Sequence, residues 1–116
     1  MLTMYGIPNC DTVKKARAWL DRHGVAYDFH DYKKRGITAA TLQHWCDTLG
    51  MDQLLNRRGT SWRKLDDAER AAADASEKRA LQLMMANPSL IKRPLLDTGN
   101  RLLAGFSEES YRSLLA

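Results

Sequence analysis

Cysteine and long apolar runs are both scarce in this sequence. Its 116 residues include two cysteines, too few for the disulfide framework of a small secreted domain. Neither cysteine belongs to a CxxC motif or to a cysteine and histidine cluster with metal-ligand spacing, so we expect no metal site. No apolar run is long enough to cross a bilayer, and the first residues lack the charged start of a signal peptide. These absences predict a cytoplasmic protein without membrane contact, in which a thiol stays reduced.

A strong charge of one sign is also missing. Lys and Arg number 18 against 14 Asp and Glu, and both signs are interspersed along the chain. The nearest approaches to a basic run, at residues 33–35 and 57–58, are shorter than the basic stretches by which proteins bind nucleic acid. The sequence therefore predicts no nucleic-acid binding, while the small excess of cations favours small anionic ligands.

The signals for helices and strands begin with a short apolar segment at residues 2–5. Residues 11–23 then carry apolar side chains at helical spacing, and residues 25–32 alternate between apolar and polar as a half-buried strand does. This order predicts a βαβ unit whose two strands are parallel. The length and a hydrophobic fraction of 44% suffice for one core, so we expect a single domain over residues 1–116.

The middle of the chain favours helices and its end favours a hairpin. Residues 38–50 have a capping residue, an apolar helical face and a terminating glycine, and residues 66–86 favour helix with a break near Ser76. Residues 95–105 show two apolar segments around a Gly and Asn turn, which is the pattern of a β-hairpin. A last helix is expected from Ser107. The sequence therefore predicts a helical insertion followed by ββα.

Cys10 occupies the turn between the first predicted strand and the first predicted helix. The unpaired N–H groups and the positive end of the helix dipole would face its sulfur, and both lower the pKa of a thiol. A free cysteine is often a buried core residue, but the neighbours Asn9, Asp11 and Thr12 are polar and typical of an exposed turn. We therefore predict that Cys10 is the reactive thiol.

Cys46 has neighbours of the opposite kind. It shares one predicted helical face with the apolar residues Leu42, Trp45 and Leu49. We therefore predict that Cys46 lies in the core. Val13 stands where a CxxC motif would have its second cysteine, so no neighbouring thiol can resolve an oxidised Cys10. Either Cys46 approaches through a rearrangement, or an external thiol such as glutathione or a glutaredoxin acts.

Four arginines are candidates for holding an anion beside the thiol, because a guanidinium group is a planar fork that suits oxyanions and carboxylates. Arg57 and Arg58 lie in a predicted loop. Arg93 directly precedes Pro94 at the start of a predicted strand, and Arg101 opens the partner strand. Any single arginine is commonly a solvated surface residue. The placement of the last two on the predicted sheet favours a role in binding.

Residues 5–20, 87–94 and 100–106 together carry a family resemblance that runs nearly from end to end. The first segment resembles the active-site opening of the arsenate reductase (ArsC) and Spx family, and the other two resemble its second and third signatures. The branch most similar in pattern is the YffB-like one, which is short and has one active-site cysteine. The resemblance implies an α/β, thioredoxin-like (glutaredoxin-like) fold that has a mixed four-stranded sheet and a helical insertion.

The resemblance also implies the roles of individual residues. It implies a catalytic thiolate at Cys10 and oxyanion-binding arginines at Arg93 and Arg101. It also implies a substrate-binding role for Pro94, at whose cis peptide thioredoxin folds present a backbone edge to the substrate. A third arginine falls on Arg57 or Arg58, and the choice between these two stays open. Substrate-binding roles for Asn9 and Lys14, which lie in the first segment, complete the expected site, and Lys14 would supply positive potential.

Two functions follow as expectations. The first is a glutathione-dependent thiol reductase that resembles arsenate reductases: Cys10 attacks an oxidised thiol or a small oxyanion, and an external thiol releases the adduct. Glutathione is then a co-substrate, and no cofactor stays bound. The second is an Spx-like, non-enzymatic transcriptional regulator that binds the RNA polymerase α subunit. Spx-like members usually carry a CxxC switch, which Val13 removes here. The physiological substrate, and arsenate in particular, is left open.

Overall fold

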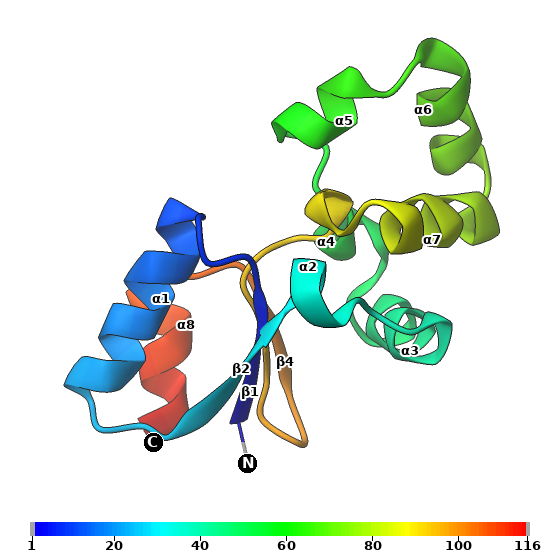
Figure 1. The fold of residues 1–116 in the computed structure, drawn as a ribbon. Coiled ribbons are helices and arrows are strands. Elements are labelled where there is room, and N and C mark those ends of the chain that lie inside the picture. Colours follow the sequence, from blue (N-terminus) through cyan, green and yellow to red (C-terminus); the bar gives the residue numbers. More distant parts are fainter. Residues whose placement is uncertain (1, 116) are drawn as a thin grey trace. The chain divides into compact units, whose positions relative to one another are not determined.

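The computed structural model describes residues 2–115, which fall into two compact units. The first unit consists of the chain up to Arg35 and from Arg93 onward, and the second is Gly36–Lys92. The second unit corresponds to the predicted helical insertion (Figure 1).

The first unit is built on a mixed four-stranded sheet. Its elements are β1 (Leu2–Gly6), α1 (Asp11–Arg22), β2 (Tyr27–Asp31), α2 (Tyr32–Arg35), β3 (Leu95–Asp97), β4 (Leu102–Ala104), α8 (Glu108–Arg112) and the 3-10 turn η2 (Ser113–Leu115). The strand order is β2-β1-β3-β4, and β1 is parallel to β2 and antiparallel to β3. The predicted βαβ and ββα halves and the mixed sheet of a thioredoxin-like fold are confirmed.

The start of α2 differs from the sequence prediction. Tyr32 was expected as the last residue of a strand, but β2 ends at Asp31 and Tyr32 begins the short helix. The carboxylate of Asp31 accepts a hydrogen bond from the backbone N–H of Lys33 at 2.9 Å, which turns the chain out of the extended conformation. Tyr32 is nevertheless buried, so the alternating pattern indicated its burial correctly.

The core of the first unit lies between the sheet and the helices α1 and α8. Figure 1 shows both helices on the same side of the sheet. The edge of the Trp19 ring meets Tyr111 with centroids 5.6 Å apart, and Phe106 meets the same tyrosine at 4.8 Å. The buried cluster consists of Met4, Val13, Ala16, Trp19, Leu20, Leu96 and Tyr111. Burial of each large member stabilises the fold by about 1.5–3 kcal/mol, and this fixes α1 against the end of β1.

The second unit is helical. Its elements are α3 (Ala39–Leu49), α4 (Met51–Leu54), α5 (Thr60–Lys64), α6 (Asp67–Ala75), α7 (Glu77–Ala86) and the 3-10 turn η1 (Pro88–Leu90). Thr38 caps α3 by accepting a hydrogen bond from the Thr41 N–H, as predicted. Ser76 ends α6 and caps α7, so the predicted break near this residue is confirmed.

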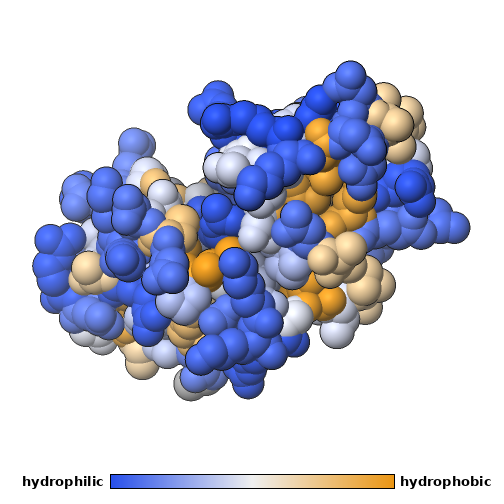
Figure 2. Space-filling view, turned by 45° about the horizontal axis from the view of Figure 1, so that its top comes forward, coloured by the Kyte–Doolittle hydropathy of each residue, from blue (hydrophilic) through white to orange (hydrophobic). Residues whose placement is uncertain are grey.

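The face shown in Figure 2 is mostly hydrophilic, with hydrophobic residues exposed between hydrophilic ones. Among residues 2–115, the large hydrophobic side chain that stays exposed is Met85, at 41%. No helix in this range is long and apolar enough to cross a membrane.

The close approach of β1 to α1 gives a first testable prediction. A Cβ atom added at Gly6 would lie 2.9 Å from Cγ2 of Val13, which is buried and stiff at χ1. We expect Gly6→Ala to lower the free energy of unfolding by about 1–3 kcal/mol, measured by urea denaturation.

The control is the same change in a Val13→Ala background, where the opposing methyl group is gone. There the additional cost of Gly6→Ala should shrink to well under half. An equal cost in both backgrounds would show that the close contact with Val13 is not the cause.

Candidate active site

Cys10 is the N-cap residue of α1, in the turn that follows β1, as predicted. Its backbone is extended, with φ −112° and ψ 125°, and its carbonyl oxygen accepts the first hydrogen bond of the helix from the Lys14 N–H at 2.9 Å. The side chain is half-buried and packs beside the core of the first unit. The thiol therefore lies at the end of a helix whose free N–H groups and dipole favour negative charge.

The pKa of the Cys10 thiol is lowered below its ordinary value. Partial burial opposes this by raising the pKa, but the backbone N–H of Val13, a hydrogen bond from the Arg93 side chain, the backbone N–H of Thr12 and the charge of Arg93 together outweigh burial. The two amides act as nearby dipoles, because the Cys10 side chain makes no N-cap hydrogen bond of normal geometry. The arrangement enriches the thiolate, which is the nucleophilic form.

Arg93 reaches this thiol from the start of the hairpin. The Arg93–Pro94 peptide is cis, as the family resemblance implied, and Pro94 is buried. The carbonyl oxygen of Pro94 accepts a hydrogen bond from the Gly105 N–H at 2.8 Å, and Leu95 pairs with Tyr5 of β1. Arg93 is therefore held at the end of the sheet where β1 ends and the chain continues to Cys10.

Two tyrosines accompany this site and were not identified from the sequence as part of it. The rings of Tyr5 and Tyr32 stack with centroids 6.3 Å apart. Burial, and then Tyr5, raises the pKa of Tyr32 far above its ordinary value, against the opposing charge of Arg93. Tyr32 is therefore a neutral phenol beside the arginine. The alternation of residues 25–32 indicated burial, but nothing in it indicated proximity to Arg93.

The second cysteine has the opposite chemistry. Cys46 is 5% exposed in α3, so the prediction of a core position is confirmed. Burial raises the pKa of its thiol, and the nearby carboxylates of Glu77 and Asp47, together with a hydrogen bond to Glu77, raise it further. Cys46 therefore stays protonated and is a poor nucleophile.

The sequence model of the ArsC family matches residues 5–114. The chain belongs to the ArsC family. It is 52% identical to a solved YFFB (PA3664) protein, with all of both chains covered and a TM-score of 0.94. An arsenate reductase (ArsC) related protein from Brucella melitensis is 46% identical over 98% of this chain and 93% of its own, with a TM-score of 0.77.

Two further relatives are similar to this chain over nearly its whole length. A protein from Haemophilus influenzae without a functional name is 40% identical over the whole of both chains. The global transcriptional regulator Spx of Streptococcus pneumoniae is 31% identical over 99% of this chain and 86% of its own. The resemblance on which the sequence analysis rested is confirmed.

Arg101, which the ArsC resemblance placed in the site, lies away from Cys10. Arg101 sits in the turn between β3 and β4, and the register pairs Asp97, just before that turn, with Thr3 near the start of β1. Its side chain donates a hydrogen bond to Ser113 Oγ at 3.2 Å. The antiparallel hairpin thus carries Arg101 to the opposite end of the sheet from Cys10. This placement corrects the expectation that Arg101 and Arg93 share one site.

The remaining predicted residues divide between the two units. Asn9 and Lys14 are exposed on either side of Cys10 in the first unit. In the second unit, Arg57 pairs with Asp52 at 3.1 Å and with Asp74 at 3.0 Å, so two carboxylates already neutralise its guanidinium group.

Arg58 is exposed, its backbone N–H donates a hydrogen bond to Asn56, and its carbonyl oxygen accepts one from Arg63. A substrate-binding role for Arg57 or Arg58 stays a prediction. Among residues 2–115, no three or more His, Cys, Asp or Glu side chains are grouped to hold a metal ion.

The contact between Arg93 and Cys10 gives a second prediction. Arg93→Gln removes the positive charge while keeping a polar side chain, so the pKa of Cys10 should rise and less thiolate should be present at neutral pH. Alkylation of Cys10 at pH 7 should slow by roughly three- to tenfold, while the rate at high pH, where the thiol is fully ionised, stays the same.

Arg101→Gln removes the same charge at the other end of the sheet and is the matched comparison. Its alkylation profile against pH should overlay that of the unmodified protein. A shifted profile for Arg101→Gln, or an unshifted one for Arg93→Gln, would contradict the assignment of Arg93 as the arginine that stabilises the thiolate.

Proposed function

We propose that this protein is a glutathione-dependent thiol reductase whose nucleophile is Cys10. The observation that carries the proposal is the thiol with a lowered pKa at the start of α1, in contact with the cation Arg93. Membership in the ArsC family and the similarity to an arsenate reductase related protein support a redox enzyme.

The proposed reaction has two thiol–disulfide exchanges. The Cys10 thiolate attacks one sulfur of an oxidised thiol, so that a new disulfide to Cys10 forms, the old disulfide breaks and a thiolate leaves with its electron pair. A glutathione thiolate then attacks the mixed disulfide and releases Cys10. The second step can equally use a glutaredoxin, and either donor supplies the electrons.

An external thiol is required because the chain offers no suitable internal one. Val13, at the position of a CxxC partner, is fully buried valine, and Cys46 is a buried thiol with a raised pKa. Attack by Cys46 would need both its exposure and its ionisation. Attack by glutathione from solvent needs neither.

Oxidised thiols fit the site better than arsenate. Arsenate carries several negative oxygens, and the resemblance implied a group of arginines around it. In the first unit, Arg93 lies at the thiol, whereas Arg101 is directed to Ser113 at the far end of the sheet. A single arginine suffices to stabilise a thiolate or one carboxylate, so the proposal names a mixed disulfide of glutathione ahead of arsenate.

This function gives a third prediction. Incubation with a small excess of glutathione disulfide should produce a mixed disulfide between glutathione and Cys10, located by peptide mapping and mass spectrometry. Cys46→Ser should give the same product at the same rate, because Cys46 takes no part. Added glutathione should then restore the free thiol.

Two results would contradict the external-thiol mechanism. One is preferential modification of Cys46. The other is rapid formation of a disulfide between Cys10 and Cys46, which would make Cys46 the resolving residue.

A second function is favoured by the similarity to Spx over nearly the whole chain. If the protein acts as a regulator that binds the RNA polymerase α subunit, a pull-down from its own cell extract should recover that subunit in near-stoichiometric amounts. Because such binding needs no thiol chemistry, Cys10→Ser should recover as much. Absence of the α subunit from both pull-downs would remove this alternative.

A further inference from the structure

A basic segment directly follows β2 and has no part in the function proposed so far. Lys33, Lys34 and Arg35 occupy the short helix α2, and all three side chains are exposed. None of the salt bridges formed among residues 2–115 involves them. Within the part of the chain that the structure describes, the acidic side chain bound to this segment is Asp31, which accepts a hydrogen bond from the backbone N–H of Lys33. The three cationic side chains are therefore exposed and available to bind an anion.

The sheet places this basic segment at the same end of the strands as the Cys10 thiol. Strands β1 and β2 are parallel and in register, with Gly6 opposite Asp31, so their carboxyl ends lie together. Cys10 follows the end of β1, and the basic segment follows the end of β2 (Figure 1). In open α/β sheets, ligands bind outside the carboxyl ends of neighbouring parallel strands. The topology alone therefore brings these charges to the edge at which Cys10 would meet its substrate.

Electrostatic contacts support this proximity. The pKa of Tyr5 is raised by burial and by Asp97, and the charge of Arg35 opposes this increase. Arg93 in turn acts on Tyr32 and on Cys10. Since Tyr5 and Tyr32 stack on each other, the charge of Arg35 acts on one ring of the stacked pair and the charge of Arg93 acts on the other. Two cations, one in the helix after β2 and one just before β3, thus act on the same pair of tyrosines.

We propose that Lys33, Lys34 and Arg35 attract the negative groups of the disulfide that Cys10 attacks, and thereby select small anionic disulfides such as the mixed disulfides of glutathione, for which glutathione disulfide is the probe. The inference rests on the proposed thiol reductase function. A glutathione disulfide carries carboxylates on both halves, so one half can meet Arg93 while the other meets the basic segment. The exchange itself is unchanged: Cys10 gains a bond to one sulfur, and the other sulfur leaves as a thiolate.

The test compares three disulfides that differ in charge: glutathione disulfide, which is anionic, hydroxyethyl disulfide, which is neutral, and cystamine, which is cationic. Each reacts with Cys10 in a Cys46→Ser background, and mass spectrometry follows the rate. In Lys34→Gln/Arg35→Gln, the rate with glutathione disulfide should fall roughly tenfold at low ionic strength, because electrostatic attraction raises association rates by at least that factor. The rate with the neutral hydroxyethyl disulfide should stay within about twofold of that of the unmodified protein. The loss of rate with glutathione disulfide should diminish when salt is added.

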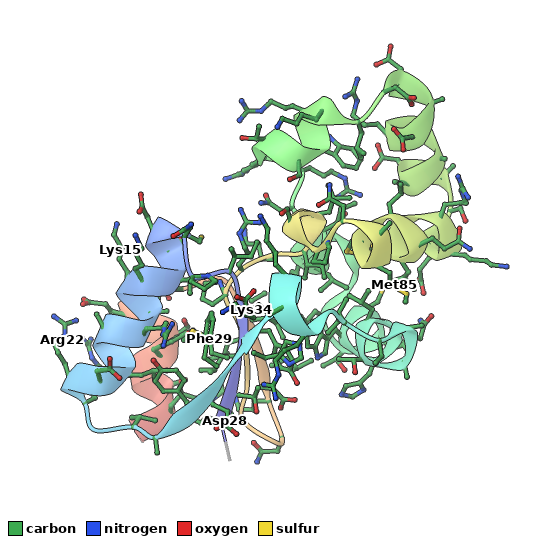
Figure 3. The ribbon with its side chains drawn as sticks, viewed as in Figure 1. Lys15, Arg22, Asp28, Phe29, Lys34 and Met85 are labelled. Carbon is green, nitrogen blue, oxygen red and sulfur yellow. The ribbon has the colours of Figure 1, made fainter. Side chains whose placement is uncertain are left out.

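A matched control removes two exposed charges from the same unit. Arg22 lies in the last turn of α1, and Arg112 lies in the last turn of α8. Figure 3 shows Arg22 at one end of the unit and Lys34 at the other. Arg22 forms only an exposed pair with Glu108 at 3.8 Å, which contributes little stability. Arg22→Gln/Arg112→Gln should therefore keep the anionic rate within about twofold.

The possible outcomes separate this inference from the function on which it rests. A selective loss with the anionic disulfide in the first variant supports the inference. An equal loss in the control, an equal loss with all three disulfides, or no loss at all would overturn it while leaving Cys10 as a working nucleophile. Failure of unmodified Cys10 to react with even the neutral disulfide would overturn the proposed function itself.

Discussion

The chemistry of this protein depends on one balance, between the cost of partly burying the Cys10 thiolate and the positive potential that surrounds it. Burial alone would keep the thiol protonated and inert. The amides of the first turn of α1 and the cation Arg93 reverse that outcome, so the pKa falls instead. A half-buried sulfur gains from this arrangement, because the same shielding from water that opposes ionisation also strengthens every favourable charge contact.

The fold holds the Cys10 thiol, the first turn of α1 and Arg93 together. The core between the sheet and α1 fixes the first turn of the helix, and Gly6 allows β1 to approach Val13 closely enough for the turn to be tight. The pairing of Leu95 with Tyr5, together with the hydrogen bond from Gly105 to Pro94, holds Arg93 at the same edge. Helix dipole and arginine are thus positioned by separate parts of the chain, and loss of either would leave the other in place.

The two cysteines show how position divides one chemical group into two roles. Cys46 lies among apolar side chains and next to the carboxylate of Glu77, and each neighbour favours its protonated form. Cys10 lies next to backbone N–H groups and a cation, which favour its ionised form. The proposed mechanism, with a single nucleophile and an external thiol, rests on this contrast, and the basic residues of α2 are proposed to attract the disulfide that Cys10 attacks.

The sequence by itself determined the order of elements, the position of Cys10 at the start of a helix and the core position of Cys46, because local periodicity and capping residues encode these nearby relations. The family resemblance added the cis peptide before Pro94. The tertiary structure decided which distant residues share the site. The fold brought Tyr32 near Arg93, and strand register sent Arg101 to the far end of the hairpin, although Arg93 and Arg101 are close in sequence. Such pairings depend on how strands align across the sheet, and no spacing along the chain records that alignment.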